Sequence, residues 1–150
     1  MMKKWGILLI CLFALTFTYK GCVKDSDGGP DFVDYFSIDR EYYKIGRING
    51  DSTSFFGTAI GNPNVRIDIK FGRVPTDGRY LARPNDDNLD SNECNIIITN
   101  FPISYTSKNQ TNPQESFIDV KRDGNRFTID LANVIMIPGN YVTNGNLRTR

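Results

Sequence analysis

The chain of 150 residues is 39% hydrophobic and 23% charged, which fits one modest globular domain and excludes a two-domain enzyme. Its 18 basic and 17 acidic residues give a formal net charge of +1 without a basic cluster, so nucleic acid is not an expected partner. The absence of histidine excludes Ser-His-Asp triads, Cys-His pairs and histidine-ligated zinc. Only carboxylate, Lys or Tyr chemistry, or an oxygen-ligated ion, remains open.

Residues 1–21 have the composition of an export signal. Lys3 and Lys4 precede an uncharged run from Trp5 to Tyr19, which we expect to be helical. Fifteen helical residues cover only about 22 Å, short of the roughly 30 Å hydrocarbon core, so a permanent membrane-spanning helix is the weaker interpretation. We therefore interpret this segment as a signal peptide.

A cysteine follows directly after the apolar run. The pair Gly21-Cys22 resembles the lipobox of bacterial lipoproteins, although Tyr19 and Lys20 replace the residues that the family prefers there. The resemblance implies that the signal is cut before Cys22 and that this cysteine carries acyl chains such as palmitate. Each buried methylene contributes about 0.8 kcal/mol, so two or three chains anchor a soluble domain durably.

The residues after the cysteine refine this resemblance. Lys24, Asp25, Ser26 and Asp27 look like the short signal that sends lipoproteins of the Bacteroidota to the outer face of their outer membrane. The resemblance implies a lipid-anchored, surface-exposed outer-membrane protein whose anchor contacts the membrane. As an alternative, the protein is secreted after cleavage elsewhere, and Cys22 forms a disulfide with Cys94. With Cys22 acylated, Cys94 is instead expected to be buried and inert at the start of a strand.

The rest of the chain divides into a tether and a domain. Residues 22–31 contain few apolar side chains and a Gly-Gly-Pro, so we expect a flexible tether. Residues 32–150 form the predicted β-rich domain. Alternating apolar and charged residues in 65–71 predict a strand with one solvated face.

Further strands follow from the same alternation. Segments 116–121 and 126–131 flank Asp123-Gly124, which predicts an antiparallel hairpin. Turns are predicted at 61–64 and 75–78. Weaker patterns predict strands at residues 35–39, 42–48, 54–60, 79–82, 95–99 and 134–137.

These elements predict an all-β protein. We expect an antiparallel β-sandwich or a partly closed barrel of seven to nine short strands, with a helix only in the signal segment. The hairpin around Gly124 and the segment Gly78-Arg79-Tyr80 resemble features of small β-domains in Bacteroidota lipoproteins. That resemblance implies no particular activity.

Four groups of residues are candidate sites. Tyr42 and Tyr43 could stack on sugar rings, although most aromatic residues of this region are expected to pack in the core. Ser52 lies in Asp51-Ser52-Thr53, which resembles an O-glycosylation acceptor sequence of the Bacteroidota. Asp68 and Asp130 form the best carboxylate pair, but their neighbours indicate a solvated face with ion pairs.

The fourth group is the acidic loop 85–93. It gathers oxygen ligands, yet Ser91 and Ile97 replace the glycine and the glutamate that an EF-hand requires. We therefore expect a solvated loop, with a calcium site as the alternative that the sequence leaves open. We assign no metal ligand, cofactor or catalytic residue.

The first functional hypothesis is a non-enzymatic interaction or accessory module at the cell surface, with an unknown protein or glycan partner. Alternatives are a glycan-binding or glycan-processing surface component, and a lipocalin-like carrier of small ligands. An exposed, concave aromatic patch would favour a glycan role, whereas buried aromatics favour the first hypothesis. A carrier would require an apolar cavity.

Overall fold

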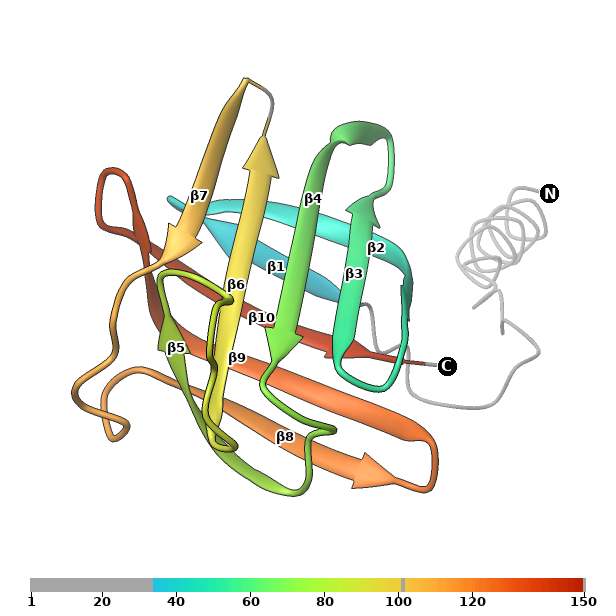
Figure 1. Ribbon diagram of the computed structural model, residues 1–150. Helices are drawn as coiled ribbons and strands as arrows, with labels where there is room; N and C mark the ends of the chain where they lie inside the picture. The colour runs from blue at the N-terminus through green and yellow to red at the C-terminus, as the bar shows by residue number, and fades with distance from the viewer. Residues whose placement is uncertain (1–33, 101, 150) are drawn as a thin grey trace, which may run out of the picture. The chain divides into compact units, whose positions relative to one another are not determined.

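The computed structural model describes residues 34–100 and 102–149, and these residues form ten β-strands (Figure 1). The expected signal helix and the expected tether lie outside the described residues. The strands are β1 (Tyr35–Ile38), β2 (Glu41–Gly50), β3 (Ser54–Ala59), β4 (Asn62–Phe71), β5 (Gly78–Arg83), β6 (Glu93–Asn100), β7 (Ile103–Ser107), β8 (Phe117–Asp123), β9 (Arg126–Ile137) and β10 (Tyr141–Arg148).

Nine of the strands close a barrel. They follow the order β10-β1-β2-β3-β4-β6-β5-β8-β9, and β9 pairs with β10 to complete the ring. The extra strand, β7, pairs with β6 through residues 103–106 and with β9 through Thr106 and Ser107. Strand β6 is therefore joined to β9 in two ways. One end of β6 reaches β9 through β5 and β8, and the other end reaches it through β7.

The strands of the barrel form two crossed layers. Figure 1 shows β3, β4 and β6 running steeply across β1, β10 and β9. Strand β2 belongs to both layers, because its first half pairs with β1 and its second half pairs with β3. The register of β2 shifts between Ile45 and Ile48, and such irregularities allow a strand to bend.

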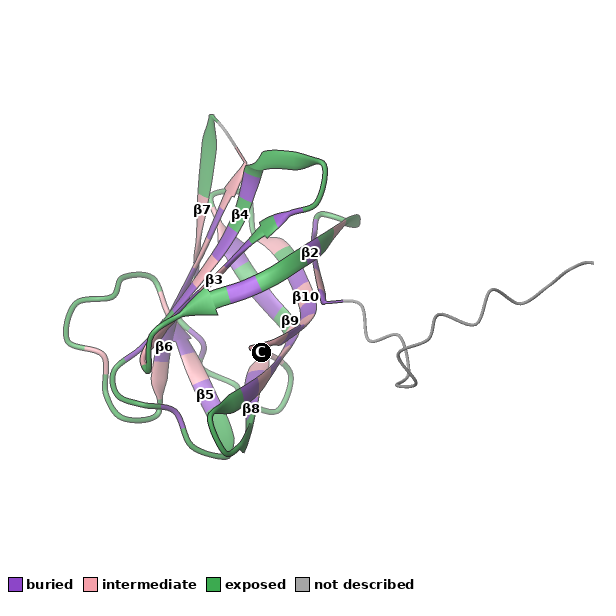
Figure 2. Cartoon of the chain, turned by 90° about the vertical axis from the view of Figure 1, so that its right-hand side faces the viewer, coloured by how far each residue is buried: buried purple, intermediate pink, exposed green. Residues whose placement is uncertain are grey.

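Alternation along the strands fills the interior. Val65, Ile67, Ile69 and Phe71 of β4 are all buried, whereas the residues between them point outward. Figure 2 shows this alternation along β4, whereas β2 is mostly exposed and buries only Ile45 and Ile48. These buried side chains belong to one cluster of buried apolar residues, and a small space beside Ile48, Phe55 and Leu147 has no room for a water molecule. The barrel is therefore a packed core.

Most sequence predictions agree with this fold. The all-β class is confirmed, and segments 116–121 and 126–131 form the expected antiparallel neighbours, β8 and β9. Gly124 has φ of +61° in the turn between them. The other predicted strands are present with shifted ends.

Other predictions need correction. The barrel is closed rather than partly closed, and the β5–β6 pair is parallel. Its nine strands lie within the expected range, but the described residues form a tenth strand, β7, outside the ring. Segments 126–131 and 134–137 form one strand, β9. Asn133 between them adopts φ of +53°, yet the strand continues past it. Residues 62–64 belong to β4 instead of the predicted turn. Strands β7 and β10 were not predicted.

Gly57 of β3 tests how tightly the interior is packed. A Cβ atom there would lie 2.6 Å from Ile45 Cγ2 and 2.6 Å from Ile48 Cδ1. We expect Gly57→Ala to lower the free energy of unfolding by about 1–3 kcal/mol because of overpacking. Gly46→Ala is the matched control, since its Cβ would meet only Ile60, at 3.5 Å and beyond. Equal urea midpoints for the two variants would contradict tight packing.

Candidate functional site

The predicted anchor cannot be placed in the structure. Cys22, Lys24, Asp25 and Asp27 lie outside the described residues. Within the part of the chain that the structure describes, no helix has the length and hydropathy of a membrane span. The anchor therefore stays a prediction from the sequence.

Tyr42 and Tyr43 point to opposite faces of β2. Tyr42 is 74% exposed, and its ring lies 6.1 Å from that of Tyr35. Tyr43 is half-buried, because its ring stacks on Phe36 at 5.4 Å. Its hydroxyl donates to Glu41 Oε2 at 2.5 Å. The two tyrosines therefore do not form one platform, and Tyr42 is the exposed ring.

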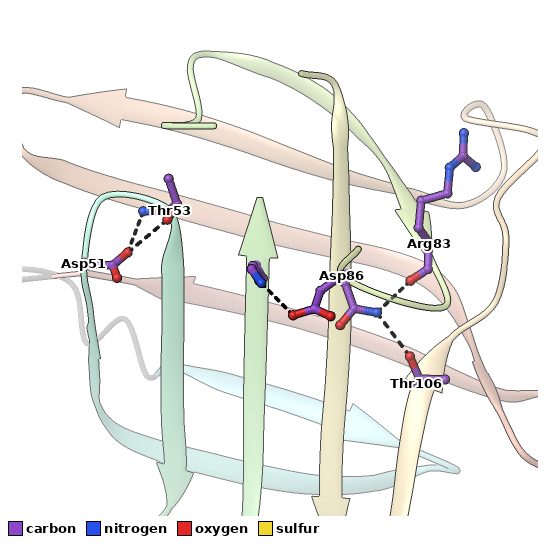
Figure 3. Close-up of polar contacts among 7 residues, drawn as sticks. Asp51, Thr53, Arg83, Asp86 and Thr106 are labelled. Atoms are coloured by element: carbon purple, nitrogen blue, oxygen red, sulfur yellow. Dashed lines mark hydrogen bonds and ion pairs between the residues drawn. The ribbon is translucent and has the colours of Figure 1, made fainter. Parts of the chain in front are cut away.

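Ser52 lies exposed in the turn between β2 and β3, as an acceptor site for a sugar would. The turn is held by Asp51, whose Oδ1 accepts the backbone N–H groups of Thr53 and Ser54, both at 2.8 Å (Figure 3). These hydrogen bonds lower the pKa of Asp51. Asp51 thus has a structural role in this turn.

The carboxylates considered for catalysis have separate partners. Asp68 accepts hydrogen bonds from Arg66 Nε at 2.9 and 2.8 Å, on the same strand. Asp130 of β9 accepts one from Asn146 of β10. Because β4 and β9 are not neighbours in the sheet, these aspartates do not share a site.

The acidic loop before β6 is held by ion pairs. Lys70 Nζ lies 2.6 Å from Asp86 Oδ2, and this contact lowers the pKa of Asp86 (Figure 3). Arg83 Nη2 lies 2.5 Å from Glu93 Oε1, and Glu93 also accepts the backbone N–H of Asp90. Among the described residues, no group of three or more acidic or cysteine side chains could hold a metal ion.

The structure reveals a groove that the sequence did not indicate. We call it the outer groove, and it follows one row of outward side chains across β3, β4, β6, β7 and β9. The cross-strand register places these side chains next to one another in the order Phe56, Asp68, Ile97, Thr106 and Ile137.

The outer groove has two sections that meet at Asp86, Asn95 and Ile97. The larger section has a volume of about 530 Å³ and extends to Ile137 and Pro138. The smaller section has a volume of about 280 Å³ and extends to Phe56 and Arg66. Because both sections share three lining residues, we treat them as one continuous surface.

The charges along the groove are balanced. The guanidinium of Arg66 lies 4.2 Å from the centre of the Phe56 ring and binds Asp68 at the same time. The second ion pair joins Lys70 to Asp86. The groove therefore offers two neutralised ion pairs beside an apolar floor at Ile97.

Asn95 is buried beneath the groove and fixes its floor. Its Nδ2 donates to the carbonyl oxygen of Arg83 at 2.8 Å and to Thr106 Oγ1 at 3.2 Å. Thr106 Oγ1 in turn donates to the carbonyl oxygen of Pro84 at 2.7 Å. Figure 3 shows these two hydrogen bonds as dashed lines that end at Arg83 and Thr106. They hold the loop before β6 against β7.

Cys94 is buried and free at the second position of β6, as the sequence predicts. Burial raises the pKa of its thiol, so the reactive thiolate is disfavoured at neutral pH. This thiol is therefore not a candidate nucleophile.

Only one strand of the outer groove could be predicted from the sequence. Alternation in 65–71 already placed Arg66, Asp68 and Lys70 on one solvated face. The neighbours of that face were unknown, because strand order and register join β4 to β6 and not to the next strand in the chain.

Comparison of the chain with protein-family models, with curated proteins and with solved structures finds no match.

The contacts of Tyr43 with Phe36 and Glu41 can be tested by pH titration. Burial and the adjacent Glu41 raise its pKa to about 12. The contribution of Tyr43 to stability should be complete below the pKa of an unfolded tyrosine, about 10, and should be lost as the pH rises towards 12. We expect Tyr43→Phe to remove the latest step from the ultraviolet titration of tyrosinate. Tyr42→Phe is the control and should leave that step in place.

Proposed function

We propose that this protein is a lipid-anchored, non-enzymatic interaction module on the outer face of a bacterial outer membrane. The anchor is Cys22, and Lys24, Asp25 and Asp27 form the export signal. Eleven residues, 23–33, separate Cys22 from the first described residue. Fully extended they reach about 36–40 Å, enough to hold the barrel clear of a membrane.

The interaction role in this proposal is supported by the outer groove. The barrel interior is filled by a cluster of buried apolar side chains, so a partner would bind on the outside, where the outer groove offers a recess of about 530 Å³ in its larger section. This packing does not favour a lipocalin-like carrier. The pKa values of Asp51, Asp86 and Glu93 are lowered by hydrogen bonds that hold turns and ion pairs, which supports structural roles for these carboxylates.

The chemistry of the groove suits an extended segment of a partner protein. Its row of side chains crosses five strands, a length of about 19 Å, which matches roughly six extended residues. Ile97, Ile137 and Pro138 supply apolar contacts. Both ion pairs of the groove are internally neutralised, so the groove carries no unpaired charge that would call for an oppositely charged partner.

Glycan binding is the second candidate, supported by the exposed ring of Tyr42, which lies beside the half-buried ring of Tyr35. The register places Asn146 beside Tyr35 on the outer face of β10, where its amide could accompany a stacked sugar. Most other aromatic residues are buried or half-buried, which supports the first candidate over this one.

The anchor is tested by Cys22→Ala. We expect the protein to leave the membrane fraction and to lose incorporation of radiolabelled fatty acid, because no acyl acceptor remains at this position. Cys94→Ala is the matched control, since it removes a buried thiol and should leave both properties unchanged. Labelled, membrane-bound Cys22→Ala protein would contradict the anchor.

The groove is tested by a photo-crosslinking amino acid placed at Ile97 in the native membrane. We expect one defined protein adduct there and none with the same group at Lys121, which is exposed on β8 outside the groove. The same group at Tyr42 examines the second candidate. A carbohydrate adduct at Tyr42 without a protein adduct at Ile97 would favour glycan binding and contradict the groove proposal.

A further inference from the structure

A second recess lies at a different place on the barrel, where β10 ends. We call it the end recess; its main lining residues are Arg47, Phe55, Val74, Arg122, Phe127 and Thr149. Its volume is about 350 Å³, at the lower end of the range for small-molecule sites. It shares only Phe55 with the outer groove.

The floor of the end recess is apolar and rigid. The rings of Phe55 and Phe127 lie 5.1 Å apart and are 4% and 6% exposed, so their edges are anchored in the core. Thr149 fixes the adjoining wall, because its backbone N–H donates to the carbonyl oxygen of Phe127 at 2.9 Å. Val74, 37% exposed, adds an apolar side chain from the loop after β4.

Arg122 is held in place at one side of the recess. Its backbone N–H donates to Asp77 Oδ1 at 2.7 Å, and its Nε donates to the carbonyl oxygen of Gly124 at 2.8 Å. The guanidinium carbon lies 5.4 Å from the centre of the Phe127 ring. These contacts leave both terminal nitrogens of Arg122 without a carboxylate among the described residues.

Arg47 of β2 also lines the recess, and its side chain forms no ion pair with a carboxylate among the described residues. The carboxylate that also lines the recess is Asp51, whose Oδ1 already accepts Thr53 N, Thr53 Oγ1 and Ser54 N (Figure 3). Asp51 therefore stabilises the turn between β2 and β3. With two arginines and one carboxylate among its lining residues, the recess has a net positive charge.

The other arginines of the described residues differ from Arg47 and Arg122 in their partners or in their location. Arg66, Arg79, Arg83 and Arg148 each form an ion pair with a carboxylate. Arg40, Arg73 and Arg126 have no ion pair in the described residues, but they do not line the end recess. The end recess thus combines two arginines that have no carboxylate partner among the described residues with the rings of Phe55 and Phe127, and the Arg122 guanidinium lies against the Phe127 ring.

We propose that the end recess binds a small organic oxyanion, a carboxylate or a phosphate ester with a flat apolar body. The oxyanion accepts hydrogen bonds from Arg47 and Arg122, whose planar donor groups match two oxygen atoms of such an anion. The apolar body lies against Phe55 and Phe127. This site is separate from the membrane anchor and from the outer groove, and it does not rest on the function proposed above.

Calorimetric titration of the purified full chain in a non-ionic detergent tests this proposal. The probes are phenyl phosphate and benzoate. Inorganic phosphate is the control that lacks an apolar ring, and benzyl alcohol is the control that lacks a negative charge. We expect at least one organic anion to bind at least about tenfold more tightly than inorganic phosphate and benzyl alcohol, because only the organic anions use both halves of the recess. Comparing phenyl phosphate with benzoate identifies the preferred oxyanion.

Substitutions assign the binding to the recess. Arg47→Gln and Arg122→Gln should each weaken binding of the preferred anion by about tenfold, the loss of one charge-assisted contact. Arg126→Gln is the matched control, since this exposed arginine lies outside the recess, and binding should stay within about twofold. Thermal melts confirm that the variants fold. No binding of either organic anion, binding no tighter than that of inorganic phosphate, or equal binding by Arg47→Gln and Arg126→Gln would overturn the proposal.

Discussion

The structure depends on a barrel interior that is filled by one cluster of buried apolar side chains. Buried isoleucines on neighbouring strands, such as Ile67 and Ile69 of β4 and Ile96 and Ile98 of β6, point inward at matched heights. Because alternate residues of a strand face opposite sides, filling the inside also determines the outside. Arg66, Asp68 and Lys70 face outward for this reason, and binding surfaces can form only on the outer wall and at the ends of the barrel.

The fold class could be predicted from the sequence because this alternation is local. The strand at 65–71 and the hairpin around Gly124 are readable from a few consecutive residues. Strand β10 escaped prediction because it contains Asn144-Gly145, a pair typical of turns, yet here Gly145 lies within the strand beside Phe36. A Cβ at Gly145 would lie 2.7 Å from the carbonyl oxygen of Tyr35, so this glycine permits a close approach of β1.

The candidate sites were less accessible to prediction, because they depend on contacts between distant segments. The outer groove combines β4 with β7 and with the loop before β6, and the end recess combines β2 with the β8–β9 hairpin. Local patterns drew attention to the acidic loop and to the paired tyrosines Tyr42 and Tyr43. In the structure, Asp86 and Glu93 of the loop are engaged in ion pairs, and the two tyrosines face opposite ways.

Asp34 forms an ion pair with Arg148, with 3.4 Å between Asp34 Oδ1 and Arg148 Nε, just before β1 begins. Strand β1 is paired on both sides, with β2 and with β10, over the same four residues. A pull on the chain preceding Asp34 would load both ladders lengthwise, so their hydrogen bonds would share the force at once rather than break in succession. With an anchor at this end, as proposed above, tension along β1 would be shared by its two ladders.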